Sequence, residues 1–156
     1  MVRTSPRPEP TVVGWREWIG LPDLGMPRIK AKLDTGARSA TLHAYDIRRF
    51  RRKGVSMARF RVHPVQRDVR TSVEAEAPVV GQRKVRSSSG QVSIRWVIRT
   101  DLELMGRRYP IEITLTRRDE MGFRMLLGRQ ALRRHFIVSP GRSFVAGLPP
   151  TRGPNA

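Results

Sequence analysis

The sequence predicts an all-β domain with one short helix near its C-terminal end. Short runs of alternating apolar and polar residues recur along the chain, and turn-forming residues separate them. Residues 130–136 form the only convincing helical segment, and it is too short to organise a helical fold. No internal repeat and no coiled-coil heptad is present. Strands are therefore expected to build the core.

The predicted strands begin with residues 12–19, which end at a Gly-Leu-Pro turn. In the second strand, residues 28–33, Ile29, Ala31 and Leu33 alternate with basic residues, as in a half-buried strand. Further strands are predicted over residues 41–47, 57–63, 72–80, 91–104 and 109–116.

Two β-hairpins are predicted among these strands. A short loop containing glycine, residues 105–108, joins the strand 91–104 to the strand 109–116. The second hairpin pairs residues 79–85 with residues 91–96, and the segment 86–90 forms its tip.

Composition limits the class of protein. The 156 residues suffice for one packed core, expected over residues 12–147, with disordered tails at 1–11 and 148–156. Because cysteine is absent, disulfides and thiolate metal sites are excluded, and a reducing compartment is expected. No run of 18 apolar residues and no secretory signal is present. We therefore expect a cytoplasmic protein without a membrane span.

The net charge is the extreme feature of the composition. Lys and Arg number 31 against 13 Asp and Glu, which gives a formal charge of +18. Such a field attracts polyanions, so nucleic acid, an anionic membrane face and an acidic peptide are all candidate partners. A solvated arginine-rich surface without a partner explains the charge equally well. Charge alone does not decide among these interpretations.

A possible catalytic motif follows the second strand, which leads directly into Asp34-Thr35-Gly36. The strand delivers one carboxylate to a tight loop, and the glycine lets backbone N–H groups approach that carboxylate closely. The threonine hydroxyl can brace the loop. For the tripeptide alone, a plain turn containing Asp and Gly is the competing interpretation.

A second motif lies downstream, where Met-Leu-Leu-Gly-Arg at residues 125–129 precedes the short helix. This motif and the Asp-Thr-Gly motif resemble the two hallmarks of retropepsins, and the hairpin with its tip at 87–90 lies where retropepsins place the flap. The resemblance covers residues 12–143. It implies a retropepsin-like closed β-barrel, the acid-protease fold, with Asp34, Thr35 and Gly36 as catalytic residues.

Within that group the chain is similar to the bacterial family labelled ATP-dependent zinc proteases, which is associated with the ribosome-modifying ATP-grasp glutamate ligase. The similar blocks are residues 14–18, 30–38, 85–90, 111–116 and 121–129. The resemblance implies an aspartic endopeptidase acting on an acidic substrate, for example a glutamate-tailed ribosomal protein. It also implies two sets of supporting residues: substrate contacts from Ala37, Arg38, Ser87, Ser88, Ser89 and Gly90, and loop support from Leu127, Gly128 and Arg129. No cofactor is expected, and no phosphate-binding glycine loop supports the ATP dependence in the family's label.

Arg38 departs from the retropepsin pattern. Viral retropepsins carry an acidic residue at this position, where it pairs with the arginine of the Gly-Arg motif. Arg38 and Arg129 would instead repel each other on direct contact. One interpretation is that Arg38 faces the cleft and binds substrate carboxylates, and the other is that it is a solvated surface arginine.

The mechanism of such an enzyme requires two carboxylates that share one proton, one acting as acid and the other activating water. This chain has a single Asp-Thr-Gly. We therefore expect a twofold homodimer in which each subunit supplies Asp34.

Two other functions compete with the peptidase hypothesis. A zinc hydrolase would use His43, His63 and His135, although no two of these have helical ligand spacing and structural roles are favoured. A nucleic-acid-binding module, or an accessory contact with the ribosome or RNA, is indicated by the runs 48–53 and 59–61, where phenylalanine is interleaved with arginine.

Four other side chains receive structural interpretations. Trp15 and Trp18 lie on opposite faces of the first strand, so one is expected in the core and one at an edge. Glu112 and Asp119 are the remaining candidates for a partner acid, and both are predicted to be solvated.

Overall fold

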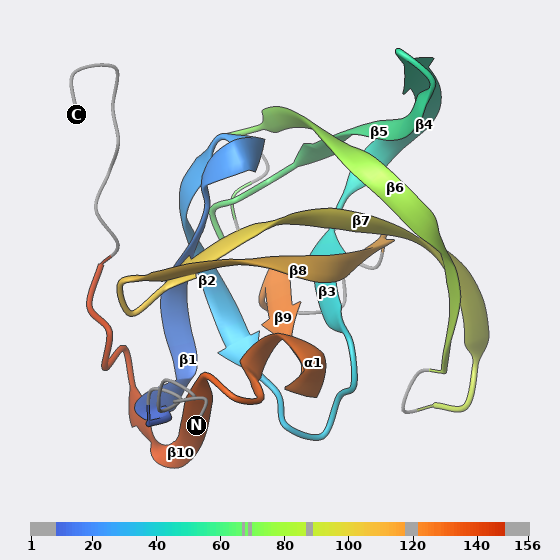
Figure 1. Ribbon diagram of the computed structural model, residues 1–156. Coiled ribbons are helices and arrows are strands. Elements are labelled where there is room, and N and C mark those ends of the chain that lie inside the picture. The colour runs from blue at the N-terminus through green and yellow to red at the C-terminus, as the bar shows by residue number, and fades with distance from the viewer. Residues whose placement is uncertain (1–8, 67, 69, 87–88, 118–121, 149–156) are drawn as a thin grey trace, which may run out of the picture.

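The computed structural model describes residues 9–66, 68, 70–86, 89–117 and 122–148, and it confirms the all-β prediction (Figure 1). The described strands are β1 (Thr11–Leu21), β2 (Met26–Leu33), β3 (Ala40–His43), β4 (Tyr45–Arg52), β5 (Val55–Val62), β6 (Val73–Arg86), β7 (Val92–Leu104), β8 (Arg107–Thr116), β9 (Met125–Leu127) and β10 (Phe136–Ser143). A 3-10 helix, η1 (Pro22–Leu24), and a helix, α1 (Arg129–Leu132), complete the set. The predicted tails, 1–11 and 148–156, lie largely outside the described residues.

One sheet contains all the strands, in the order β10-β1-β2-β9-β3-β8-β7-β6-β5-β4. The sheet curves so strongly that β7 and β8 cross β1 and β2 in Figure 1. The apolar faces enclose one core, in which Ile29, Ile98 and Ile113 are fully buried. β1 also meets β7, through the pair Gly20–Glu103 alone. Closure of the sheet into a barrel therefore stays a prediction.

The alternating patterns predicted the bounds of five strands to within about two residues at each end. These strands are β1, β2, β5, β7 and β8. The predicted strand over residues 41–47 is wrong, because the chain forms two strands there. β3 ends at His43 and pairs with β8 and β9, whereas β4 begins at Tyr45 and pairs with β5. A positive φ of 50° at Asp46 accompanies a shift in the register of β4 against β5. The chain thus leaves the core layer after Ala44.

Both predicted hairpins are confirmed. β7 and β8 are antiparallel around the turn at Met105 and Gly106, which both have positive φ. β6 and β7 are antiparallel from Val79 to Arg86, and β6 joins the two segments 72–80 and 79–85 into one long strand.

The C-terminal part of the chain differs from the prediction. The helix ends at Leu132 instead of continuing to Phe136, and Arg134 has a φ of 73°, which helical residues do not adopt. Phe136 begins β10, which pairs in parallel with β1. The pattern missed β10 because its second half, Ser-Pro-Gly-Arg-Ser, resembles a turn.

Glu17 on β1 is fully buried, and its carboxylate holds the segment that follows β10. It accepts hydrogen bonds from the backbone N–H groups of Gly14, Val145 and Ala146, at 2.6, 2.9 and 3.0 Å. Three such donors offset the desolvation of the charge. This buried acid therefore joins the two ends of the described fold.

The prediction for the two tryptophans is wrong, because both side chains are half-buried. Trp15 meets the edge of Phe123 at 6.0 Å between ring centroids, and Trp18 lies 6.1 Å from Phe144. The Arg16 guanidinium covers the rings of Trp15 and Phe144 at 4.8 and 4.9 Å. Neither indole is part of the buried core.

No described helix is long and apolar enough to cross a membrane.

Candidate active site

The loop of residues 34–39, called the Asp34 loop below, connects β2 to β3 and lies beside α1 in Figure 1. β2 and β9 are parallel neighbours, with Leu33 opposite Leu127. Their ladder continues one residue further, because the backbone N–H of Asp34 donates to the carbonyl oxygen of Leu127 at 2.8 Å. The position of Asp34 is therefore set by the sheet.

The Asp34 side chain points back toward its own loop. The Gly36 N–H donates to Oδ1 of Asp34 at 2.9 Å, and the Ala37 N–H donates to the Asp34 carbonyl oxygen at 3.2 Å. These bonds close a tight turn and orient the carboxylate. Asp34 is half-buried, whereas Thr35 and Gly36 are exposed. The carboxylate thus combines a fixed orientation with access to solvent or to a second subunit.

Gly128 brings the loop and the start of α1 into direct contact. A Cβ on this residue would overlap the Ser39 carbonyl oxygen and would lie 2.8 Å from the Arg38 carbonyl carbon. Backbone N–H groups of the first turn of α1 then bind the loop: Arg129 donates to the Ala37 oxygen at 2.8 Å and Gln130 to the Arg38 oxygen at 3.1 Å. Only glycine permits this approach.

The Arg129 side chain bonds to the same loop. Its Nη1 donates to the carbonyl oxygen of Thr35, with 3.0 Å between the two atoms. The Arg38 side chain is exposed and makes no hydrogen bond or ion pair with any described residue. Arg129 thus contacts the backbone of the loop, and the Arg38 guanidinium is directed to solvent.

The sequence that surrounds the site matches a known family. A family model described as RimB-like, retropepsin-like aspartic endopeptidase RimB, matches residues 12–149. The chain belongs to the RimB-like family. The predicted relation to the peptidase family associated with a glutamate ligase is thereby confirmed.

This RimB-like chain is also similar to parts of larger proteins. It is 41% identical over 136 residues to a probable alpha-L-glutamate ligase of Shewanella halifaxensis, covering 87% of this chain and 30% of that protein. A protein of the same name from Parasynechococcus marenigrum is 46% identical over 136 residues, which are 87% of this chain and 29% of that protein. The chain therefore spans about 30% of the length of these curated relatives.

A solved structure shares the fold of this RimB-like chain. It is a crystal structure of a Legionella pneumophila protein of unknown function, with a TM-score of 0.73 and 30% sequence identity. The match covers 87% of this chain and 98% of that protein.

The β6–β7 hairpin, which was predicted to be the flap, is tied to the Asp34 loop through its stem. Nη1 of Arg83 on β6 donates to the Ser39 hydroxyl at 3.0 Å and to Oε1 of Gln130 at 3.4 Å. Its Nη2 donates to Glu112 on β8 at 3.0 Å. Glu112 is exposed, as predicted, and the ion pair with Arg83 adds a contact that the sequence did not indicate. Sequence reasoning missed Arg83, because no local pattern distinguishes it from the other arginines.

Two of the four predicted flap residues are described. Ser89 and Gly90 are exposed, and Gly90 has a φ of 85°, which suits glycine. Ser87, Ser88 and Asp119 lie outside the described residues. Ala37 is half-buried beside Asp34, and Leu127 is fully buried behind the loop.

The three histidines that were considered as zinc ligands have different neighbours. His43 is buried on β3, with its backbone N–H bonded to the Arg124 oxygen at 2.8 Å. His63 stacks on Tyr45 at 4.6 Å, and its Nδ1 lies 3.0 Å from the Thr71 oxygen. His135 stacks on Tyr109 at 3.9 Å, and burial together with Arg107 lowers its pKa. Within the described part of the chain, no group of three His, Cys, Asp or Glu side chains is placed to hold a metal ion.

Proposed function

We propose that this chain is an aspartic peptidase whose catalytic dyad forms when two copies bring their Asp34 loops together. The observation that carries the proposal is the half-buried Asp34 carboxylate, which is held by the Gly36 N–H at 2.9 Å on a loop whose next two residues are exposed. Membership of the RimB-like family supports the same chemistry. We assign the peptidase domain to residues 12–147 and expect its sheet to close as a retropepsin barrel.

In the proposed mechanism, one Asp34 carboxylate accepts a proton from water while the water oxygen bonds to the substrate carbonyl carbon. The other Asp34, protonated, stabilises the carbonyl oxygen as charge develops there. The C–N bond then breaks as the leaving nitrogen takes up a proton. The two carboxyl groups titrate as a pair, because like charges at close range cannot both ionise. Thr35 and Gly36 would fix the loops across the twofold axis.

We propose that the substrate is an acidic peptide, such as a glutamate-tailed protein. The names of the larger relatives support this choice, since a ligase that adds glutamate would make such a tail. Arg38 is exposed on the Asp34 loop, and in this proposal it binds substrate carboxylates in a bidentate fork. Ala37 and the tip of the hairpin at residues 87–90 would cover the peptide and exclude water.

The first experiment compares the wild type with Asp34→Asn on a glutamate-tailed peptide and on an unrelated peptide, with products read by mass. We expect the wild type to cleave the tailed peptide and Asp34→Asn to lose roughly 10³-fold or more in rate. Asp23→Asn is the matched control, because it neutralises an exposed carboxylate on η1 that pairs with Arg108. Undiminished cleavage by Asp34→Asn would reject the proposal.

The second experiment measures the salt dependence of cleavage. A formal charge of +18 should steer an acidic substrate toward the protein, so kcat/KM should fall steeply as ionic strength rises. A neutral peptide with the same scissile bond is the control and should show a much weaker dependence. Equal rates at low and high salt would contradict an acidic substrate.

A further inference from the structure

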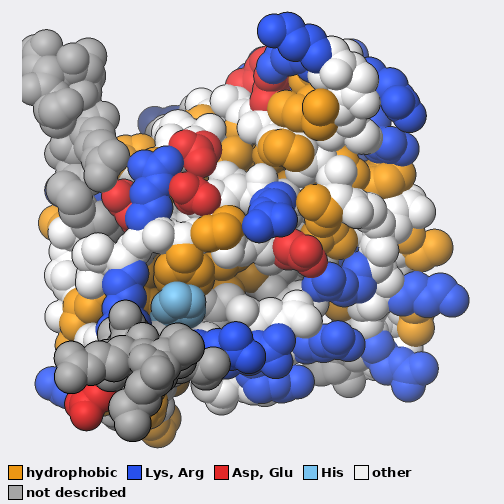
Figure 2. All heavy atoms as spheres, in the orientation of Figure 1, with side chains coloured by type: hydrophobic (Ala, Val, Ile, Leu, Met, Phe, Trp, Pro, Cys, Tyr) orange, Lys and Arg blue, Asp and Glu red, His pale blue; other side chains and the backbone are white. Residues whose placement is uncertain are grey.

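The far end of the sheet is a strongly basic arm made of β4, the connecting turn and β5 (residues 45–62, the β4–β5 arm below). β4 is the last strand in the sheet order, so its outer edge pairs with no other described strand. The arm carries one acid, Asp46, and seven basic residues: Arg48, Arg49, Arg51, Arg52, Lys53, Arg59 and Arg61. Figure 2 shows Lys and Arg side chains gathered at this upper right end of the molecule. The arm therefore has a local excess of positive charge.

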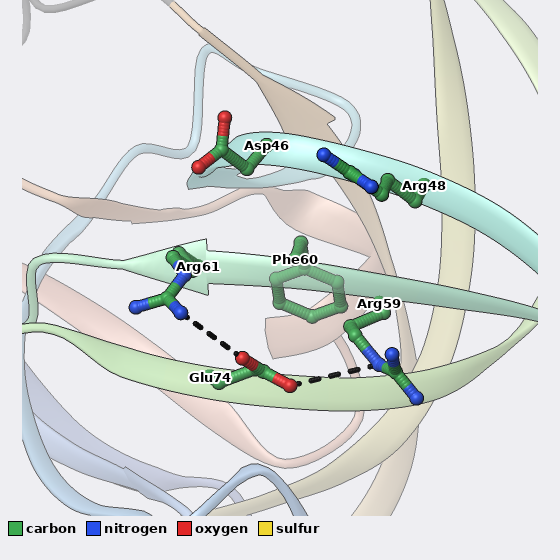
Figure 3. A pocket seen from close by; sticks show the side chains of 6 residues that line it. All are labelled: Asp46, Arg48, Arg59, Phe60, Arg61 and Glu74. Carbon is green, nitrogen blue, oxygen red and sulfur yellow. Dashed lines mark hydrogen bonds and ion pairs between the residues drawn. The ribbon is translucent and has the colours of Figure 1, made fainter.

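Part of that charge is neutralised by β6. Figure 3 shows Arg59 and Arg61 directed toward Glu74, at 3.6 and 3.3 Å. Glu76 binds Arg52 at 2.7 Å and Arg59 at 2.9 Å, and these arginines lower the pKa of the Glu76 carboxyl. In the predicted nucleic-acid run 59–61, Phe60 is fully buried and therefore cannot stack on a base, and both arginines are ion-paired.

Three other cations of the arm have no such partner. Arg48, Arg51 and Lys53 are exposed and form no ion pair with any residue that the structure describes. Arg117, just after β8, is likewise exposed and forms no ion pair in the described part of the chain. The excess of positive charge is thus concentrated on β4 and at the end of β8.

A cavity of about 390 Å³ lies among these cations. Asp46, Ile47, Arg48, Trp96 and Arg117 line it. Trp96, on β7, is half-buried, and the Arg49 guanidinium lies 4.2 Å from the centre of its ring. The cavity therefore combines two cations that form no ion pair with a described residue, one carboxylate and an indole ring.

We propose that the β4–β5 arm, together with Trp96 and Arg117, binds single-stranded nucleic acid. Arg48 and Arg117 would contact backbone phosphates, and an unpaired base would stack in the cavity against Trp96. Guanidinium groups beside an aromatic ring are the arrangement with which proteins hold single strands. An acidic peptide would use the cations but would gain nothing from the indole, so the ring favours nucleic acid. This inference does not depend on the proposed peptidase activity.

The test measures binding of a fluorescently labelled oligouridylate by anisotropy over a series of salt concentrations. We expect Arg48→Gln/Arg117→Gln to weaken binding roughly tenfold or more and to reduce the slope of log K against log salt by about 1.4. Trp96→Leu, which retains an apolar side chain, should weaken binding about fivefold to 100-fold with little change in that slope. Circular dichroism checks that each variant is folded.

The matched control is Arg133→Gln/Arg142→Gln, which removes two exposed arginines outside the arm. This control loses the same two positive charges as the test variant. Apart from the effect of the lower net charge, its affinity should change less than about twofold. Equal losses in the two double variants, or no binding by the wild type, would overturn the proposal. A glutamate peptide is the competing ligand. The proposal would also be overturned if this peptide displaced the oligonucleotide, and if its affinity fell in Arg48→Gln/Arg117→Gln as much as that of the oligonucleotide but did not fall in Trp96→Leu. A deoxyuridylate of the same length tests whether the site distinguishes RNA from DNA.

Discussion

The guanidinium group of Arg129 donates a hydrogen bond to the carbonyl oxygen of Thr35, at 3.0 Å. The resemblance to retropepsins raised the problem that Arg38 stands where an acid usually pairs with this arginine. A backbone carbonyl accepts from Arg129 instead, so the fixation of the loop does not need that acid. The Arg38 side chain is exposed, so water can screen its charge from that of Arg129.

Replacing Arg129 by alanine should therefore reduce peptidase activity without unfolding the protein. Loss of one charge-assisted hydrogen bond to the loop should lower kcat/KM about tenfold, because Asp34 would be less well oriented. Arg129→Lys should retain part of the activity. The exposed Arg133→Ala is the control and should stay within about twofold of the wild type. A loss in Arg133→Ala as large as that in Arg129→Ala would indicate a general charge effect.

Gly128→Ala should destabilise the fold. The added methyl group would overlap the backbone at Ser39, so the free energy of unfolding in urea should fall by about 3 kcal/mol or more. Gly141→Ala is the control, since a Cβ there meets no atom within 4 Å. Its effect should remain within about 0.5 kcal/mol. Equal stability of the two variants would show that the loop and α1 do not pack as closely as described.

Glu17→Gln should lower stability because the neutral amide cannot accept all three backbone hydrogen bonds. We expect a loss of about 2–4 kcal/mol in the free energy of unfolding. Glu74→Gln, which changes an exposed ion pair, should cost less than about 1 kcal/mol. If both substitutions had the same small effect, the carboxylate of Glu17 would not be holding Val145 and Ala146.

His135 should make stability depend on pH. Burial, with a smaller contribution from Arg107, lowers the pKa of His135 in the folded protein below its ordinary value of 6.5. The unfolded chain therefore binds a proton first as pH falls. The contribution of His135 to the free energy of unfolding is fully present above the pKa that this side chain has in the unfolded chain. It is lost as pH falls toward the pKa of His135 in the folded protein. His135→Phe should flatten the decline in unfolding free energy between about pH 7 and pH 5. An unchanged slope would contradict this assignment.

Much of the fold could be predicted from the sequence, because alternation of apolar and polar residues marks strands with one buried face. β2 is the clearest example, with Ile29, Ala31 and Leu33 all buried. β10 could not be found in this way, since its parallel partner β1 lies more than a hundred residues earlier in the chain. The break at Ala44 was hidden because an alternating pattern does not show when a strand changes its neighbour.

The site was only partly predictable. The residues of the Asp-Thr-Gly and Gly-Arg motifs are together in space, as the resemblance implied. The bonds of Arg83 to Ser39 and Glu112 could not be predicted, because one long side chain on β6 joins the Asp34 loop and β8, which are distant in sequence. The role of Glu17 was equally hidden, since an acid on an alternating strand ordinarily faces solvent.

The central claim is that two Asp34 carboxylates act together, and mixing subunits tests it most directly. Equal amounts of wild type and Asp34→Asn are unfolded, mixed and refolded, so that subunits pair at random. A dyad shared across the dimer leaves only wild-type pairs active, which is about one quarter of all dimers. Activity should therefore be about one quarter of that of the same total amount of refolded wild type. A value of about one half, as expected for subunits that work independently, would contradict the account.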